Sequence, residues 1–178
     1  MPADSLVVDG SGDININNSI NFSDGSSINS NKLYLCKVKY ASLGDLATNN
    51  TWVYKQNQFN SSFLINEGGF GLGTNGITIP ISGYYEIHIV NYFDNITNDR
   101  GSIISALAIN GSFSNEDYIC GSYMRFDSGL RGSRGNAGTI VRYLTQGQQV
   151  ATAWYETGDS SVINLGLNGS SFTLKRIG

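Results

Sequence analysis

The chain has 178 residues, of which 40% are hydrophobic and 14% are charged, and its net charge at pH 7 is −3. This length supports one domain with a complete core and a short appendage, and the weak negative charge gives no electrostatic case for a nucleic-acid or anionic-membrane partner. No apolar run approaches the ~20 residues of a membrane helix, so we expect no membrane insertion, and Met1–Asp4 lacks the features of a signal peptide.

Residues 1–31 differ in composition from the rest of the chain. Between Asp9 and Gly25, apolar residues alternate with Asn and Ser over short spans that Gly and Asp interrupt. A single copy of such a segment buries too little apolar surface to offset the entropy that ordering costs. Two alternatives therefore stay open. Residues 1–31 are a flexible tail, or they are a fragment of an upstream fibre shaft in which neighbouring chains supply the missing contacts.

From residue 32 onward, short segments rich in aromatic and β-branched residues follow one another at regular intervals. Asn110-Gly111 and Asn168-Gly169 are strong signals for tight turns, and no window has a convincing helical period. Many short strands separated by turns indicate an all-β sandwich or jelly roll. The expected strands are 33–40, 52–54, 62–65, 77–79, 84–93, 103–109, 118–126, 139–144, 150–155 and 171–177.

The expected strand 84–93 follows a Pro-x-x-Gly turn that ends at Gly83. Successive side chains of a strand point to opposite faces, so Tyr85, Ile87 and Ile89 would face the core. The alternate positions also carry large side chains, although the outer face of a lone sandwich should be polar. We therefore expect a partner chain to cover that face, with Tyr84, His88, Val90 and Tyr92 in the interface.

The interior of the sandwich is expected to hold eight large side chains drawn from several strands: Tyr85, Ile87, Ile89, Leu107, Leu144, Val150, Phe172 and Leu174. Cys36 and Cys120 are the only cysteines, they lie far apart in the sequence, and no CxxC motif is present. We interpret them as reduced thiols in or near the core, with a disulfide bridge as the alternative.

Four segments in chain order resemble the globular head of the C1q and tumour-necrosis-factor (TNF) superfamily, a trimeric jelly roll. Ile79–Ile87 is similar to the family's Pro-x-x-Gly-x-Tyr-x-Phe strand, with Ile87 at the Phe position. Leu107–Gly111 resembles its Leu-x-x-Asn-Gly hairpin, and Leu144–Val150 resembles its Leu-x-x-Gly-Asp-x-Val turn. Ser171–Leu174 resembles its final strand. The resemblance spans most of the chain and implies a homotrimer.

Three positions depart from this family pattern, the last being Thr173, which follows Phe172 where the family usually has Gly. Gln148 stands where the family has Asp after the turn glycine. Arg142 stands two positions before Leu144, where the family has an apolar residue. This second departure puts the register of the expected strand 139–144 in doubt or implies a β-bulge there.

The residues that could support catalysis or metal binding form no recognisable motif. His88 is the only histidine, and no Gly-x-Ser-x-Gly elbow exists to seat a nucleophile. We interpret His88 as a hydrogen-bonded structural residue, with an ion site on a trimer axis as the alternative. Some C1q-like heads bind Ca²⁺ through loop carboxylates, but no dedicated calcium loop is present. We expect no enzyme, no metal site and no cofactor, with calcium as the alternative through Asp94, Asp99, Asp127 and Asp159.

Receptor contact is expected from a loop and from aromatic rings. The glycine-rich segment Asp127–Asn136 is either a solvated hairpin loop or a receptor-contacting loop. Five aromatic residues sit among polar neighbours in the sequence: Trp52, Tyr54, Tyr123, Trp154 and Tyr155. Their rings either stack on sugars or complete the core or the subunit interface. The expected receptor-binding residues are Tyr123, Asp127, Arg131, Arg134, Asn136 and Trp154.

Together these features predict an all-β jelly-roll head over residues 32–178, preceded by the separate segment 1–31 and assembled as a homotrimer. The Asn-rich N-terminal segment and the ending Lys175–Gly178 are closer in style to bacteriophage tail-fibre tips than to animal C1q proteins. We expect a non-enzymatic receptor-binding (adhesion) head at the tip of a phage tail fibre on the virion, recognising a host-surface glycan or protein. The alternatives are a structural trimerisation cap of the fibre and an extracellular C1q-like lectin head of cellular origin.

Overall fold

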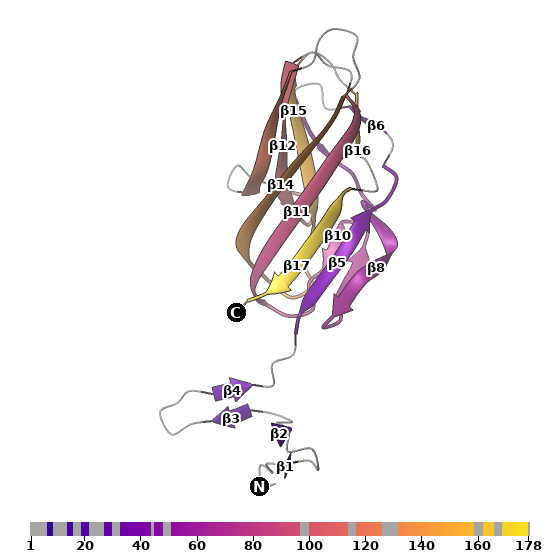
Figure 1. The fold of residues 1–178 in the computed structure, drawn as a ribbon. Coiled ribbons are helices and arrows are strands. Elements are labelled where there is room, and N and C mark those ends of the chain that lie inside the picture. Colours follow the sequence, from indigo (N-terminus) through magenta and orange to yellow (C-terminus); the bar gives the residue numbers. More distant parts are fainter. Residues whose placement is uncertain are drawn as a thin grey trace. The chain divides into compact units, whose positions relative to one another are not determined.

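The structure, a computed structural model, divides into two units, Met1–Leu33 and Tyr34–Gly178 (Figure 1). It describes the backbone of residues 7–8, 14–15, 19–21, 27–29, 33–43, 45–47, 51–96, 100–113, 117–125, 132–158, 162–165 and 169–177. It describes the side chains of residues 33–43, 51–93, 102–113, 117–121, 135–155, 165 and 169–177.

The N-terminal unit contains two short antiparallel strand pairs. β1 (Val7–Val8) pairs with β2 (Ile14–Asn15). β3 (Ser19–Asn21) pairs with β4 (Ser27–Asn29). An isolated two-stranded hairpin is marginally stable at best in water. Whether this segment is a tail or a fragment of shaft stays a prediction.

The second unit is a sandwich of two antiparallel sheets. In the first sheet, β11 is hydrogen-bonded to β14 along one edge and to β17 and β16 along the other. β17 then pairs with β5 and β5 with β8, while β16 pairs with β6. The strands of this first sheet are β5 (Leu35–Tyr40), β6 (Asp45–Ala47), β8 (Phe59–Glu67), β11 (Gly83–Ile96), β14 (Gly132–Leu144), β16 (Val162–Leu165) and β17 (Ser171–Arg176).

The second sheet has the order β13-β12-β15-β10-β9, and β7 also pairs with β15. Strands that are neighbours in space are often far apart in the sequence, as in a jelly roll rather than a simple meander. The strands of this second sheet are β7 (Trp52–Tyr54), β9 (Gly71–Gly73), β10 (Gly76–Thr78), β12 (Arg100–Ile109), β13 (Tyr118–Arg125) and β15 (Gln149–Gly158).

The core lies between the two sheets and contains all eight side chains that the sequence predicted to be there. The inward and outward alternation of β11 is the expected one, because Tyr85, Ile87 and Ile89 are fully buried. The prediction is confirmed for the whole set, Tyr85, Ile87, Ile89, Leu107, Leu144, Val150, Phe172 and Leu174, since none of these side chains is exposed to solvent. Aromatic rings pack within the core, with Phe59 5.3 Å from Phe172 and 5.2 Å from Tyr40 between ring centroids on the first sheet. The Tyr40 ring also contacts Trp154 of the second sheet, with centroids 5.8 Å apart, and so links the two layers.

Two of the turn motifs that the sequence predicted are confirmed. Asn110 and Gly111 both have positive φ angles, 52° and 80°, as a two-residue hairpin turn requires. In the second turn, Gly147 has a φ of 84°. The side chain of Gln148 accepts a hydrogen bond from the Thr145 backbone N–H at 2.8 Å. Gln148 therefore caps the turn from the position where the family has Asp.

The register of β14 is regular at Arg142, so the expected disturbance there is wrong. Arg142 pairs directly with Tyr85, and the ladder between β11 and β14 runs without a shift from Gly83 to Phe93. Arg142 points to the inner side and lies 3.3 Å from the carboxylate of Asp117, which is almost fully buried. An ion pair with Asp117, the residue before β13, thus replaces the apolar contact that the family pattern predicts.

The side chain of Gln58 completes the hydrogen bonding of β15. β10 pairs with β15 at positions 149–150 and β7 pairs at positions 153–155, so Thr152 lies in the gap between them. The buried Gln58 amide donates to the Thr152 carbonyl at 2.5 Å and accepts from the Thr152 N–H at 3.0 Å. A side-chain amide therefore takes the place of a missing stretch of strand.

Candidate functional site

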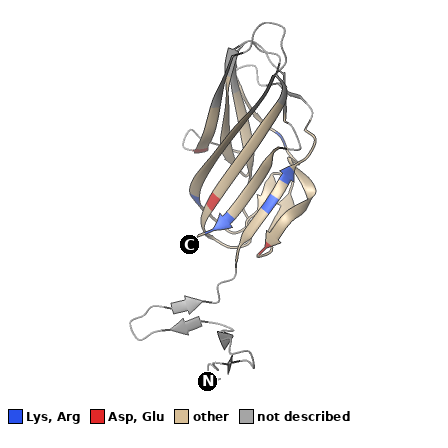
Figure 2. Cartoon of the chain, in the orientation of Figure 1, with Lys and Arg blue, Asp and Glu red and all other residues tan. Residues whose placement is uncertain are grey.

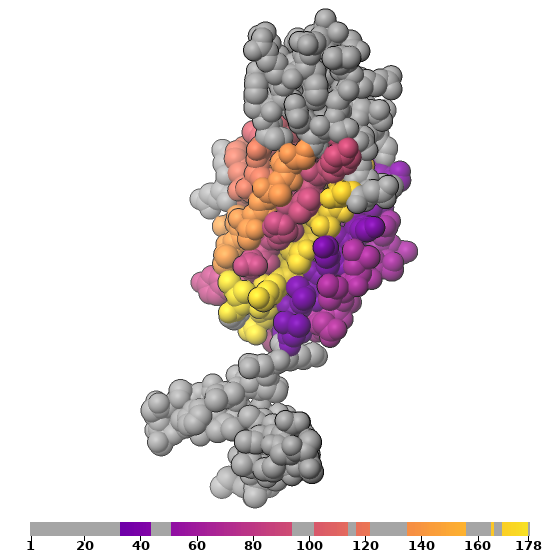
Figure 3. Space-filling model, in the orientation of Figure 1, coloured from indigo at the N-terminus to yellow at the C-terminus, as the bar shows by residue number. Residues whose placement is uncertain are grey.

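The outer face of the first sheet presents the side chains that the sequence assigned to a subunit interface. Tyr84 and Tyr92 on β11 are exposed, and His88 and Val90 between them are half-buried. β14, β11, β17, β5 and β8 run side by side across this face (Figure 3). We call it the β11–β14 face after the two longest strands on it.

Large apolar groups gather at one corner of the β11–β14 face. Tyr84 lies directly opposite Tyr143, and their rings meet edge to face with centroids 5.3 Å apart. Val141 follows on β14, and the Ile177 N–H donates to the Tyr84 carbonyl at 2.8 Å. Each of these four side chains is more than half exposed. Exposed apolar clusters of this kind mark interaction surfaces more often than scattered single residues do.

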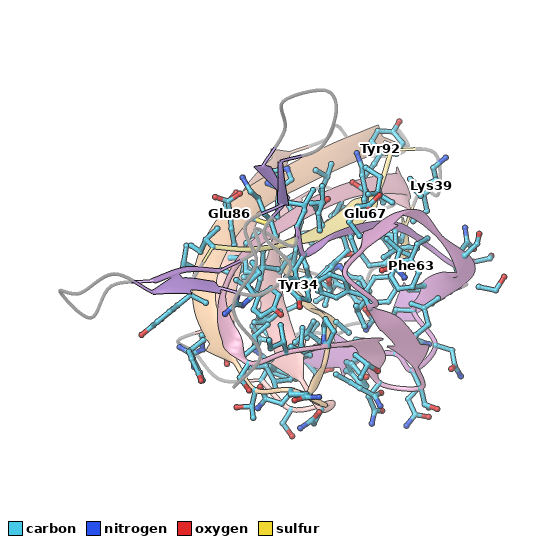
Figure 4. All side chains as sticks on the ribbon, turned by 90° about the horizontal axis from the view of Figure 1, so that it is seen from below. Tyr34, Lys39, Phe63, Glu67, Glu86 and Tyr92 are labelled. Carbon is cyan, nitrogen blue, oxygen red and sulfur yellow. The ribbon has the colours of Figure 1, made fainter. Side chains whose placement is uncertain are left out.

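The middle of the β11–β14 face is polar. Glu86 on β11 lies opposite Lys175 on β17, and Lys37 and Lys39 face outward from β5. Figure 2 shows the basic residues on β5 and β17 and the acidic residue on β11. Figure 4, which looks from below, shows Glu86, Tyr92 and Lys39 projecting outward from the sheet. The face therefore combines an apolar corner with charges of both signs.

A shallow depression of about 270 Å³ lies on the same face near Tyr92. The side chains at its floor are small, because Gly135 and Ala137 of β14 lie opposite Tyr92 and Val90 of β11. It brings together Val90 and Tyr92, which were predicted to contact a partner subunit, and Asn136, which was predicted to contact a receptor. The depression is open, so it offers a contact surface rather than an enclosed ligand pocket.

Asn136 belongs to a buried polar cluster, which corrects its expected role as a receptor contact. The Asn91 amide donates to the Ser105 hydroxyl at 2.8 Å and to the Asn136 side-chain carbonyl at 2.9 Å. The Asn136 amide donates to the Ile103 carbonyl at 3.3 Å. These hydrogen bonds connect β11 and β14 of the first sheet with β12 of the second. The cluster therefore joins the two layers of the sandwich.

Trp154 was expected as an exposed stacking ring, and this expectation is wrong. Its side chain is fully buried in the core, with its ring centroid 5.8 Å from that of Tyr40. The expected loop Asp127–Asn136 is also shorter than predicted, because β14 already begins at Gly132. Four further predicted receptor contacts have side chains that lie outside the described residues: Tyr123, Asp127, Arg131 and Arg134.

His88 has an ordinary structural environment. Its Nδ1 lies 2.9 Å from the Thr139 hydroxyl, directly opposite on β14. Within the described side chains, no group of three His, Cys, Asp or Glu residues lies close enough to hold a metal ion. The acidic residues considered for calcium, Asp94, Asp99, Asp127 and Asp159, lie outside those side chains. The described part of the chain also contains no helix long and apolar enough to cross a membrane.

The two cysteines are free thiols, and neither has the environment of a reactive group. Cys36 is buried, and its removal from water raises the pKa of the thiol to about 12 despite a hydrogen bond with the Leu174 backbone. Cys120 is half-buried, and burial raises its pKa although a hydrogen bond to Ser105 lowers it. A reactive cysteine needs the opposite shift, toward the thiolate.

A cluster of aromatic rings lies on the second sheet, and the sequence indicated only part of it. Trp52 is surrounded by Tyr118, Tyr155 and Phe113, whose ring centroids lie 5.1, 5.3 and 4.9 Å from its own. Trp52 and Tyr155 were among the aromatic residues expected to bind sugars or complete an interface. Phe113 and Tyr118 were not, because their proximity depends on the pairing of β13, β12, β15 and β7.

Comparison with known proteins places this chain by its fold. No protein-family model matches it, and no curated protein matches its sequence. The solved structure of an Eiger TNF from S. frugiperda has a TM-score of 0.55 at 12% identity, covering 83% of this chain and 94% of that one. Murine APRIL has a TM-score of 0.54 at 11% identity, covering 82% and 100%. The predicted TNF-like jelly-roll fold is therefore confirmed.

Proposed function

We propose that this chain is the homotrimeric, non-enzymatic receptor-binding head of a bacteriophage tail fibre, displayed on the virion and recognising a molecule of the host surface. The observation that carries the proposal is the β11–β14 face. It places an exposed aromatic and aliphatic corner on one face of a sandwich with a packed core.

Self-association through the β11–β14 face is supported by its composition. Tyr84, Tyr143, Val141 and Ile177 are each more than half exposed, and covering them would remove a large apolar area from water. Glu86 lies opposite Lys175, so charges of both signs border the apolar corner. The similar structures are TNF-type jelly rolls, and this similarity supports a homotrimer here.

A role in a fibre is supported by the N-terminal segment. Residues 1–33 form a unit of their own with short strand pairs and an Asn-rich and Ser-rich composition. Such a segment would gain stability from copies of itself wound around the same axis. The head would then cap the upstream shaft and present its loops to the host. This arrangement needs no cofactor and no catalytic group.

The proposal is tested by the adsorption of the labelled full chain to a panel of bacterial strains, together with a phage that infects some of them. We expect the chain to bind the susceptible strains and to slow phage adsorption to them. A trimer that binds no strain would overturn the receptor-binding function in favour of the structural cap. Equal binding to animal cells and no effect on phage would instead indicate a lectin head of cellular origin.

A further inference from the structure

We propose that the aromatic platform formed by Trp52, Phe113, Tyr118 and Tyr155 is a binding surface for an uncharged carbohydrate. This inference rests on the proposed function and names one ligand class and one surface for it. Aromatic rings bind the apolar C–H faces of sugars by stacking, and neighbouring polar groups orient the hydroxyls. The platform lies on the outer face of the second sheet, so it belongs to the opposite layer of the sandwich from the β11–β14 face.

Three rings of the platform come from separate strands that the sheet brings together, and the fourth, Phe113, lies between β12 and β13. Trp52 on β7 pairs directly with Tyr155 on β15, and Tyr118 is the first residue of β13. The planes of Phe113, Tyr118 and Tyr155 are inclined to Trp52 by 46°, 32° and 38°. Tyr118 is 43% exposed, and the other three rings are half-buried. The platform is therefore accessible to solvent and does not belong to the core.

The strands beneath the platform carry small side chains on their outer face. Thr152 and Trp154 of β15 point into the core, so the alternation of the strand places Ala151 and Ala153 on its other side. On β12, Ser105 is bonded to the first sheet, which places Ala106 on the other side, paired with Tyr118. All three alanines are fully buried, so they contribute nothing to the exposed surface.

Polar groups border the rings in the way that carbohydrate recognition needs. Tyr54 is on the same face as Trp52, two residues further along β7, and its hydroxyl donates to the Asn75 side chain at 3.5 Å. The Gln56 amide donates to the same oxygen at 3.3 Å. These side chains supply hydroxyl and amide donors and acceptors beside an aromatic surface. Sugar hydroxyls need both kinds of group at fixed positions.

The charge of the surface indicates an uncharged ligand. On β7, β12 and β15, the described side chains that face outward include no Lys, Arg, Asp or Glu. The β11–β14 face, by contrast, carries Lys37, Lys39, Lys175 and Glu86. An anionic saccharide would find no cation among the described residues of the platform. The complementary ligand is therefore a neutral glycan.

Tryptophan fluorescence of the full chain gives a direct test, because of the two tryptophans only Trp52 reaches the surface while Trp154 is buried. The probes are neutral hexasaccharides of glucose and of N-acetylglucosamine, with a sulfated hexasaccharide for comparison. We expect a neutral probe to change the fluorescence in a saturable way at both low and high salt. We expect it also to protect Trp52 from oxidation by N-bromosuccinimide. A response to no neutral probe would overturn the proposal.

Variants of the rings separate stacking from unspecific adhesion. Tyr118→Ser and Tyr155→Ser should each weaken binding of the responding probe by about tenfold or more, which corresponds to about 1.4 kcal/mol or more. The matched control is Leu72→Ser, which removes an exposed apolar side chain from the same sheet outside the platform and should leave binding unchanged. Equal affinity of all three variants and the parent would contradict the proposal.

Adsorption to bacteria distinguishes failure of the platform from failure of the proposed function. If the parent chain adsorbs and Tyr118→Ser does not, both the proposed function and the platform are supported. If Tyr118→Ser adsorbs like the parent while the double variant Arg131→Ala/Arg134→Ala does not, the proposed function stands and the platform is overturned. If the parent does not adsorb to any susceptible strain, the proposed function itself fails.

Discussion

Single residues decide whether the buried polar groups of the two sheets have hydrogen-bond partners. Gln58 occupies a gap in the hydrogen-bond ladder of β15, and Asn91 and Asn136 join the sheets through a buried polar cluster. Buried polar groups are costly when they lose a partner, so these side chains stabilise the fold although they add little apolar burial. They also explain why an Asn-rich sequence can form a well-packed sandwich.

Gln58→Leu should lower the free energy of unfolding by at least about 2 kcal/mol. The change leaves both the N–H and the carbonyl of Thr152 without their partner, and each buried group that loses its partner costs about 1–3 kcal/mol. Chemical denaturation measures the effect. The matched control is the exposed neighbour Gln56→Leu, which should stay within about 0.5 kcal/mol of the parent. Equal stabilities of the two variants would show that the Gln58 hydrogen bonds contribute little.

Phe172→Ala should cost about 3–5 kcal/mol, because Phe172 is fully buried and packs on Phe59. Thr173→Ala is its control on the outer side of β17 and should change stability little. Thermal unfolding compares the two variants. A Phe172→Ala protein that melts within roughly two degrees of the parent would refute the assignment of this ring to the core.

At the scale of elements, the alternation of inward-facing and outward-facing side chains along a strand was the reliable signal in the sequence. It predicted the buried side of β11 residue by residue, because a packed face leaves no freedom in register. It did not reveal β9 (Gly71–Gly73) or the start of β14, since glycine-rich segments look like loops until a long partner strand pairs with them. β6 and β16 were also missed, because they are short strands outside the aromatic-rich segments.

The candidate site was harder to predict than the fold. Trp154 was taken for a stacking ring because it sits among polar neighbours in the sequence. Thr152 is nevertheless buried, and its hydroxyl is bonded to Tyr40 of the other sheet at 2.6 Å. No sequence pattern shows that a threonine will meet a buried tyrosine hydroxyl. The aromatic platform likewise depends on which strands become neighbours.

Val141→Glu should weaken self-association if the β11–β14 face is the subunit interface. It places a carboxylate in the apolar corner beside Tyr84 and Tyr143, where burial in an interface would be unfavourable. Analytical ultracentrifugation at several concentrations measures the effect. Leu72→Glu makes the same change at an exposed position of the second sheet and should leave the assembly intact. If Leu72→Glu dissociates the assembly and Val141→Glu does not, the assignment of the interface to the β11–β14 face is wrong.

For the whole molecule, buried thiol and phenol groups make stability depend on pH under alkaline conditions. Burial raises the pKa of the Cys36 thiol from 9.0 to about 12, and it raises the pKa of the Tyr40 hydroxyl above its usual 10.0 despite the bond to Thr152. Both groups therefore hold their protons more tightly in the folded state than in the unfolded chain. Their contribution is complete below about pH 9 and is lost as the pH rises toward 12.

The free energy of unfolding should therefore fall steadily above about pH 9. Tyr40→Phe removes one of the groups whose pKa is raised and should make the fall above pH 10 shallower, although the variant is less stable at neutral pH. Leu72→Ala, which changes an exposed side chain without a titratable group, should keep the parental slope. Denaturant titrations between neutral pH and pH 11 give these slopes. Parallel curves for Tyr40→Phe and the parent would contradict this explanation.

The central claim is that this jelly roll assembles as a trimer through the β11–β14 face. Sedimentation equilibrium of the full chain at micromolar concentration is the most direct test, because it gives the assembly mass without any assumption about shape. We expect three times the mass of one chain for the parent and a lower mass for Val141→Glu. A parent protein that sediments with the mass of a single chain would contradict the claim.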